Sequence, residues 1–191
     1  MYEKGSKIPF NQARYLTEVS ESNPRKIQYI VMHDMEAPEG VHTAENVAEY
    51  FHTMTDGRQA SAHFCVDEDS IVQCVQCKDV AWHAPGCNSN GIGIELAGYS
   101  RFSRKDWLNP QNLATLENAA RLIAWVLHPK FHIDLKWVLE PADLVKHNGD
   151  PSFTGITTHA TVSKAFHKSD HMDPGDGFPY NEFMEMIRKN S

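Results

Sequence analysis

The sequence has no long hydrophobic run, only four cysteines and no cluster of basic residues. No stretch approaches the ~18 consecutive apolar residues of a membrane-spanning helix, so we expect no contact with a membrane. The opening stretch, MYEKGSKIPF, contains no apolar core, so we predict no secretory signal and expect synthesis in a cytoplasm. A formal net charge of −7 without a basic patch argues against nucleic acid as a partner.

The motifs of several common enzyme classes are also absent. The chain has no GxGxxG, P-loop, HExxH or GxSxG, which argues against dinucleotide binding, P-loop phosphoryl transfer, HExxH proteolysis and the α/β-hydrolase triad. Cys74 and Cys77 form a C-x-x-C pair, but the second pair that a structural zinc site needs is missing. The segment SIVQCVQC alternates apolar and polar residues like a strand, which places these two thiols on opposite faces. We therefore expect reduced cysteines that serve packing.

Strand and helix patterns alternate along the chain and predict a single α/β domain with a central mixed sheet flanked by helices. Residues 1–26 are expected to form an N-terminal extension with a short helix near 11–19, and residues 27–191 the domain itself. Expected strands cover residues 28–33, 61–67, 70–75 and 91–98, the middle two as a hairpin. Expected helices cover residues 44–54 with Thr43 as N-cap, 111–128 ended by Pro129, 141–146, 160–166 and 181–189.

Three residues have the chemistry of a metal site. His33 ends an apolar strand, His159 precedes a short helix, and Asp173 lies in the polar segment SDHMDPGDG, which can contribute little to a core. Two imidazoles and one carboxylate suit Zn²⁺ with a fourth position open for water. The spacing of these residues does not by itself show that they converge, since a histidine at a strand end is more often structural.

Four segments in this order carry a resemblance to a known family: YIVMHDME (29–36), SAHFCVDED (61–69), AWHAPGCNSNGIGIELAG (81–98) and THATVSKAFHKSDHMDPG (158–175). From about residue 27 to 175, the chain resembles the zinc-dependent type 2 N-acetylmuramoyl-L-alanine amidases, which are related to peptidoglycan recognition proteins. The last segment resembles the amidase modules of actinobacterial phage endolysins.

The resemblance implies the roles of particular residues. It makes His33, His159 and Asp173 the zinc ligands and Glu95 the general base, which then passes a proton to the leaving amine. His171 occupies the place of a lysine or threonine that faces the scissile carbonyl in relatives. It implies further that Trp82, His83 and Asn88 contact the substrate. One departure is Ala62, where some relatives carry a catalytic tyrosine, and its absence leaves more of the chemistry to Glu95.

The implied function is zinc-dependent hydrolysis of the amide between N-acetylmuramic acid and L-alanine in peptidoglycan. The resemblance implies that the protein is a monomeric phage endolysin that acts on the wall after release. Two alternatives remain. A module that only binds peptidoglycan would have a defective ligand set, and none is visible here. A zinc peptidase that cuts within the stem peptide would use the same zinc machinery, so the sequence separates it poorly.

Overall fold

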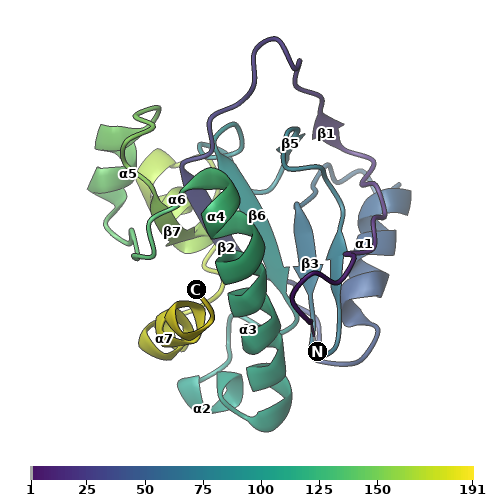
Figure 1. The fold of residues 1–191 in the computed structure, drawn as a ribbon. Coiled ribbons are helices and arrows are strands. Elements are labelled where there is room, and N and C mark those ends of the chain that lie inside the picture. Colours follow the sequence, from purple (N-terminus) through teal and green to yellow (C-terminus); the bar gives the residue numbers. More distant parts are fainter. Residues whose placement is uncertain (1) are drawn as a thin grey trace.

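A five-stranded mixed sheet forms the centre of the computed structural model, which describes residues 2–191 (Figure 1). The strand order is β4-β3-β6-β2-β7, in which β2 is parallel to β6 and β7, β6 is parallel to β3, and only β3 and β4 are antiparallel. The bounds of these strands are Tyr29–Asp34 (β2), Phe64–Val66 (β3), Ile71–Gln73 (β4), Gly91–Leu96 (β6) and Gly155–Thr158 (β7). The predicted mixed sheet is therefore confirmed.

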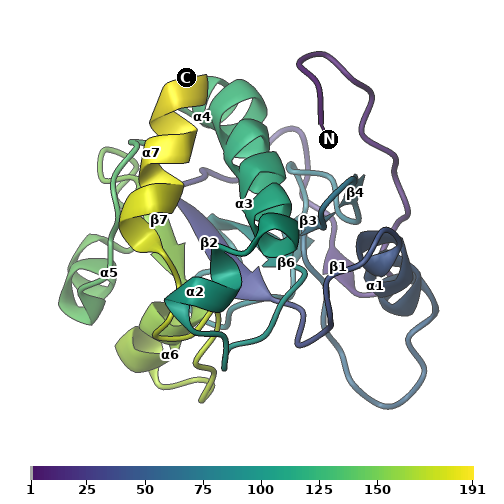
Figure 2. The ribbon, with the colours of Figure 1, turned by 90° about the horizontal axis from the view of Figure 1, so that it is seen from below.

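Helices cover both faces of this sheet. Figure 2 shows α3 and α7 together on one side of the sheet and α6 on the other, with α1 beside β3. The helices are α1 (Thr43–Thr53), α2 (Arg104–Trp107), α3 (Pro110–Leu122), the π-helical turn η1 (Ile123–Leu127), α4 (His128–Phe131), α5 (Pro141–His147), α6 (His159–Phe166) and α7 (Tyr180–Asn190). None of these helices has the length and apolarity that a membrane crossing requires.

The two faces of β2 enter different parts of the core. Ile30 and Met32 join a large apolar cluster with residues of α3, η1 and α7, whereas Tyr29 and Val31 join a second cluster on the opposite face. Side chains alternate along a strand, so His33 shares the face of Tyr29 and Val31. All six residues of β2 are buried, which explains why this strand reads as an almost continuous apolar run.

The N-terminal segment contains no helix near residues 11–19, so that prediction is wrong. The segment instead follows the edge of the sheet, where the amides of Asn11 and Ala13 donate to the carbonyls of Gln73 and Cys74. Further on, β1 (Leu16–Thr17) pairs with β5 (Val80–Ala81). Unpaired carbonyls at a sheet edge offer the backbone hydrogen bonds that a short isolated helix would have to supply alone. The boundary at residue 26 stays a prediction.

Two predicted helix ends are also corrected. Pro129 does not end the long helix, because α4 continues through it to Phe131 and the chain leaves the helix at His132, with a φ of +54°. The π-helical turn η1 ends at Leu127, two residues before this proline, so the hydrogen-bond spacing changes just ahead of the point where the missing N–H would interrupt an α-helix. Thr43 is the first residue of α1 rather than its cap, and the buried Asp67 carboxylate instead accepts from the amide of Ala44 at 2.8 Å.

The remaining elements follow the prediction with three omissions. The strands at 28–33 and 91–98, the hairpin and the helices near 141–146, 160–166 and 181–189 are present. The sequence analysis missed β5, α2 and β7, the last of which lies next to β2. All four cysteines are free and buried, and Cys74 and Cys77 belong to different core clusters, as the alternation predicted.

Candidate metal centre

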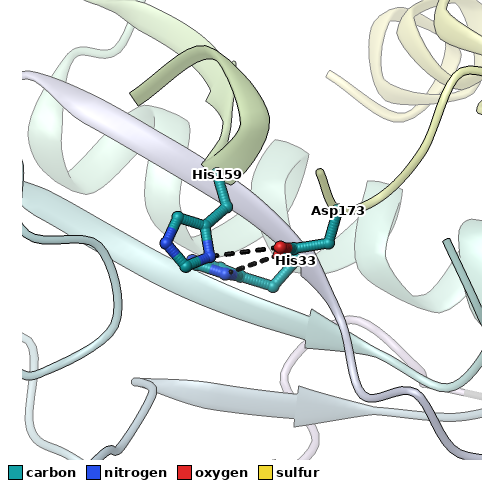
Figure 3. Close-up of side chains that lie close together, drawn as sticks. All are labelled: His33, His159 and Asp173. Carbon is teal, nitrogen blue, oxygen red and sulfur yellow. Dashed lines mark hydrogen bonds and ion pairs between the residues drawn. The ribbon is translucent and has the colours of Figure 1, made fainter. Parts of the chain in front are cut away.

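His33, His159 and Asp173 come together at the carboxyl ends of two neighbouring strands (Figure 3). His33 is near the end of β2, and His159 is the first residue of α6, directly after β7. Because β2 and β7 are parallel with Met32 opposite Thr158, the next residue of each strand lies at the same edge of the sheet. Asp173 reaches this edge from the loop between α6 and α7.

The three side chains form a compact, buried group. Their possible ligand atoms all lie within 4.8 Å of one another. The Asp173 Oδ2 atom is 3.0 Å from His33 Nδ1, and its Oδ1 atom is 3.2 Å from His159 Nδ1. Both imidazoles therefore present Nδ1 to the same carboxylate, and the three residues are only 2–6% exposed. The sequence analysis left this convergence open, and the structure shows it.

Local backbone structure fixes the two segments that flank the sheet edge. Thr158 caps α6 by accepting from the amide of Thr161 at 3.1 Å, so that His159 lies in the first helical turn. The amide of Ala160 donates to the Asp173 carbonyl at 3.0 Å, which ties the loop to the same turn. Gly175 has a φ of +87°, and a Cβ there would overlap the backbone of Ser100. Only glycine therefore lets this loop pack so closely.

The charge states suit metal ligands. Burial alone would raise the pKa of the Asp173 carboxyl, but hydrogen bonds with His159, His171 and His33 outweigh burial and hold this pKa well below its usual range. Burial lowers the pKa of His159 to about 4, although Asp173 opposes the shift. At neutral pH the group thus offers an ionised carboxylate and a neutral imidazole, the forms in which these side chains bind metal ions.

Glu95 and His171 lie beside the three residues but are not part of their compact group of possible ligands. Glu95 in β6 is directly opposite His33 in the sheet, and its Oε1 atom is 4.0 Å from His33 Nδ1. Burial, followed by the charges of Asp173 and Asp34, raises the pKa of Glu95 well above its usual range. His171 is 56% exposed, stacks on His159 with ring centres 4.0 Å apart, and lies 3.2 Å from Asp173 Oδ1. Its hydrogen bond with Asp173 raises its pKa.

A cleft of about 740 Å³ opens over this group. His33, Glu95, His159, His171 and Asp173 contribute to its lining, and so do Trp82 and the buried His83. Asn88 does not line the cleft. Its Oδ1 atom instead accepts from the amides of His83 and Ala84 at 3.0 and 2.6 Å, which makes it a brace of the loop.

Some residues of the cleft were missed by the sequence analysis. Asp34 directly follows His33, is 7% exposed and accepts from the Ser100 hydroxyl at 2.7 Å. Burial raises the pKa of Asp34 to about 7, although the Ser100 contact opposes the shift. Tyr50, Phe51 and Met54 of the α1 region form an apolar wall of the cleft. The only sequence signal for them was an apolar helical stripe, which packing alone explains.

Comparison with known proteins agrees with this site. The profile of the N-acetylmuramoyl-L-alanine amidase family matches residues 23–176, so the chain belongs to this family of peptidoglycan amidases. No curated protein sequence matches it.

Three solved structures illustrate the shared fold. The Staphylococcus aureus hydrolase AmiA, solved with its ligand, has 17% identity and a TM-score of 0.67 over 98% of this chain and 84% of that one. LysC, an N-acetylmuramoyl-L-alanine amidase from Clostridium intestinale, has 18% identity and a TM-score of 0.55 over 96% and 98% of the two chains. A mutant endolysin from Bacillus subtilis has 19% identity and a TM-score of 0.55 over 95% and 99%.

Proposed function

We propose that this peptidoglycan amidase holds a Zn²⁺ ion with His33, His159 and Asp173 and hydrolyses the bond between the lactyl group of N-acetylmuramic acid and L-alanine. The observation that carries the proposal is the convergence of these three buried donors beneath an open cleft. Two imidazole nitrogens and one carboxylate oxygen match the ligand set of a catalytic zinc site, which keeps a position free for water or substrate. When bound, zinc would supply polarisation of the amide carbonyl and a water of lowered pKa.

Glu95 is the residue that moves protons in this proposal. It is opposite His33 in the sheet, faces the cleft, and is not one of the three donors that form the compact group. Its carboxylate accepts the proton that the attacking water loses and then delivers this proton to the nitrogen of the departing L-alanine. The raised pKa of Glu95 favours keeping this proton on the carboxyl between the two steps.

His171 has the role of steadying charge on the substrate. Its contact with Asp173 and its raised pKa favour the protonated ring, and its exposure leaves part of that ring open to the cleft. A protonated imidazole there donates a hydrogen bond to the carbonyl oxygen as negative charge develops on it. Trp82 is a half-buried wall of the same cleft and offers a flat apolar surface to a sugar or peptide.

The donor set and the cleft bear differently on the two alternatives, a binding module and a stem-peptide peptidase. A complete set of three donors favours an enzyme over a module that only binds peptidoglycan. Bond choice depends on how the substrate lies in the cleft, so product analysis has to distinguish an amidase from a stem-peptide peptidase. The endolysin role is supported by the resemblance of residues 158–175 to phage amidase modules.

The first experiment is metal analysis combined with product analysis. Wild-type protein is expected to contain one zinc per chain and to release L-alanine amino termini from purified walls, and His159→Ala is expected to lose both. Amino termini of another stem residue would establish the peptidase instead. Full activity in a protein that contains no zinc and resists chelators would contradict the metal mechanism.

A further inference from the structure

The imidazole of His83 lies directly behind the proposed ligand His33. The His83 Nδ1 atom is 3.0 Å from His33 Nε2, and the two rings meet edge to face with centres 5.2 Å apart. His83 is only 7% exposed, which leaves little of its surface for a substrate. Within residues 2–191, the polar contact of the His83 ring is thus with His33 Nε2, the ring nitrogen that faces away from Asp173.

The surrounding backbone has a shape that accepts this ring. A Cβ on Gly93 of β6 would lie 2.6 Å from His83 Cγ and 2.8 Å from its Nδ1, so a residue with a side chain could not occupy this position without moving the ring. The amide of His83 donates to Asn88 Oδ1 at 3.0 Å, which fixes the main chain before the loop. The ring is thus held from the strand side and from the loop side against His33.

A packing role alone does not explain a histidine here. The His83 Nε2 atom is buried, and no hydrogen-bond partner for it is found among residues 2–191. Burying an unpaired polar atom lowers stability, and an apolar side chain would fill the same space without that cost. The single polar benefit of the ring is the contact that its Nδ1 atom makes with His33.

The same contact has a chemical consequence for metal binding. A histidine that binds a metal through Nδ1 must carry its proton on Nε2. In His33 that proton would point at His83 Nδ1, which can accept it when His83 carries its own proton on Nε2. A hydrogen bond from the far nitrogen of a ligand fixes its tautomer and the direction of its ring.

We propose that His83 is a positioning residue that orients His33 for metal binding and is not a contact for the substrate. This inference rests on the proposed metal site, because it gives His33 Nδ1 the role of a ligand. It replaces the substrate role that the family resemblance implied for His83.

The test compares zinc affinity in variants of His83. His83→Phe keeps a flat ring but removes the acceptor, and it should weaken zinc binding by about 10–100-fold in a chelator competition assay. His83→Asn keeps an oxygen near the position of Nδ1 and should recover most of that loss. His63→Asn is the control for replacing a buried histidine in this cluster, since the His63 ring meets His83 edge to face but makes no hydrogen bond with His33. Circular dichroism verifies that each variant is folded.

A second measurement needs no variant. Nitrogen-15 NMR of the zinc-loaded wild type should show both His33 and His83 protonated on Nε2. A proton on His83 Nδ1, or a folded His83→Phe that binds zinc like the wild type and only raises KM, would overturn the inference while leaving the metal site intact. A wild type without zinc would instead contradict the proposed function.

Discussion

Replacing Gly93 by alanine tests the geometry behind the metal centre without changing any side chain that bears chemistry. The new Cβ would lie 2.6 Å from His83 Cγ, whereas ordinary contacts begin at 3.4 Å, so the ring has to retreat by roughly 0.8 Å. A retreat along the hydrogen bond would lengthen the 3.0 Å contact with His33 to about 3.8 Å, which is beyond hydrogen-bonding distance. Because β6 and its neighbours are buried on both faces, the strand has little room to shift instead.

Two quantities should change together in Gly93→Ala. Overpacking a well-filled site costs roughly 1–3 kcal/mol, which corresponds to a fall in Tm of roughly 2–12 °C for a chain of this size. Loss of the contact behind His33 should weaken zinc binding by about tenfold. Calorimetry measures the first quantity and competition with a chromophoric chelator the second. Both losses together would show that the glycine maintains the position of His83.

Gly40→Ala is the matched control. A Cβ at Gly40 would meet only the Thr43 hydroxyl oxygen, at an ordinary distance of 3.5 Å, so its effect on stability should stay within about 0.5 kcal/mol. The reasoning is refuted if Gly93→Ala retains both the melting temperature and the zinc affinity of the wild type, because His83 would then have moved without consequence or not at all.

Three further predictions concern single carboxyl groups. Glu95→Gln should lower kcat by about 10²–10⁴-fold while zinc content stays at the wild-type level, and a parallel loss of zinc would show that Glu95 is a ligand. Asp173→Asn should abolish stoichiometric zinc binding, which elemental analysis of the dialysed protein would detect; retained zinc would exclude it as a ligand. Burial, with the neighbouring Asp67 and Glu68, raises the pKa of Glu39 from 4.5 to about 7, so the folded state holds an extra proton and wild-type stability should fall as pH rises through this window. Glu39→Gln should remove this pH dependence. Its free energy of unfolding at pH 8 should exceed that of the wild type by about 1–2 kcal/mol after allowance for partial exposure. Urea denaturation at pH 5 and pH 8 measures both effects.

The proposed ligands could be named from sequence because their local context made them candidates and the family resemblance implied their role. His33 ends an apolar strand, and Asp173 lies in a segment too polar for the core. Their convergence was not accessible from spacing, since it depends on β7 lying beside β2, and no strand was predicted there. Its four residues, GITT, are too few and too mixed to give a periodic signal.

The interior of the site was the least predictable part. The pairing of His83 with His33 is possible only because Gly93 has no side chain to occupy the space of the His83 ring. The contact of Asn88 depends on the loop folding back, so that the Asn88 side chain accepts from the amide of His83. The family resemblance implied that Trp82, His83 and Asn88 all contact the substrate, whereas only Trp82 and His83 are among the residues that line the cleft. Tertiary contacts also determine the conformation of the N-terminal segment, which is hydrogen-bonded to a sheet edge where the sequence predicted a helix.

The position of Asp173 has a consequence for the mechanical integrity of the molecule. All four cysteines are free, so no disulfide links distant parts of the described chain. An ion shared by His33 and Asp173 would join residues 140 positions apart and fasten the loop before α7 to the centre of the sheet. Closing so long a loop removes more freedom from the unfolded chain than closing a short one. The ion would therefore act as a reversible staple, and proteolysis between α6 and α7 would report on metal occupancy as directly as activity does.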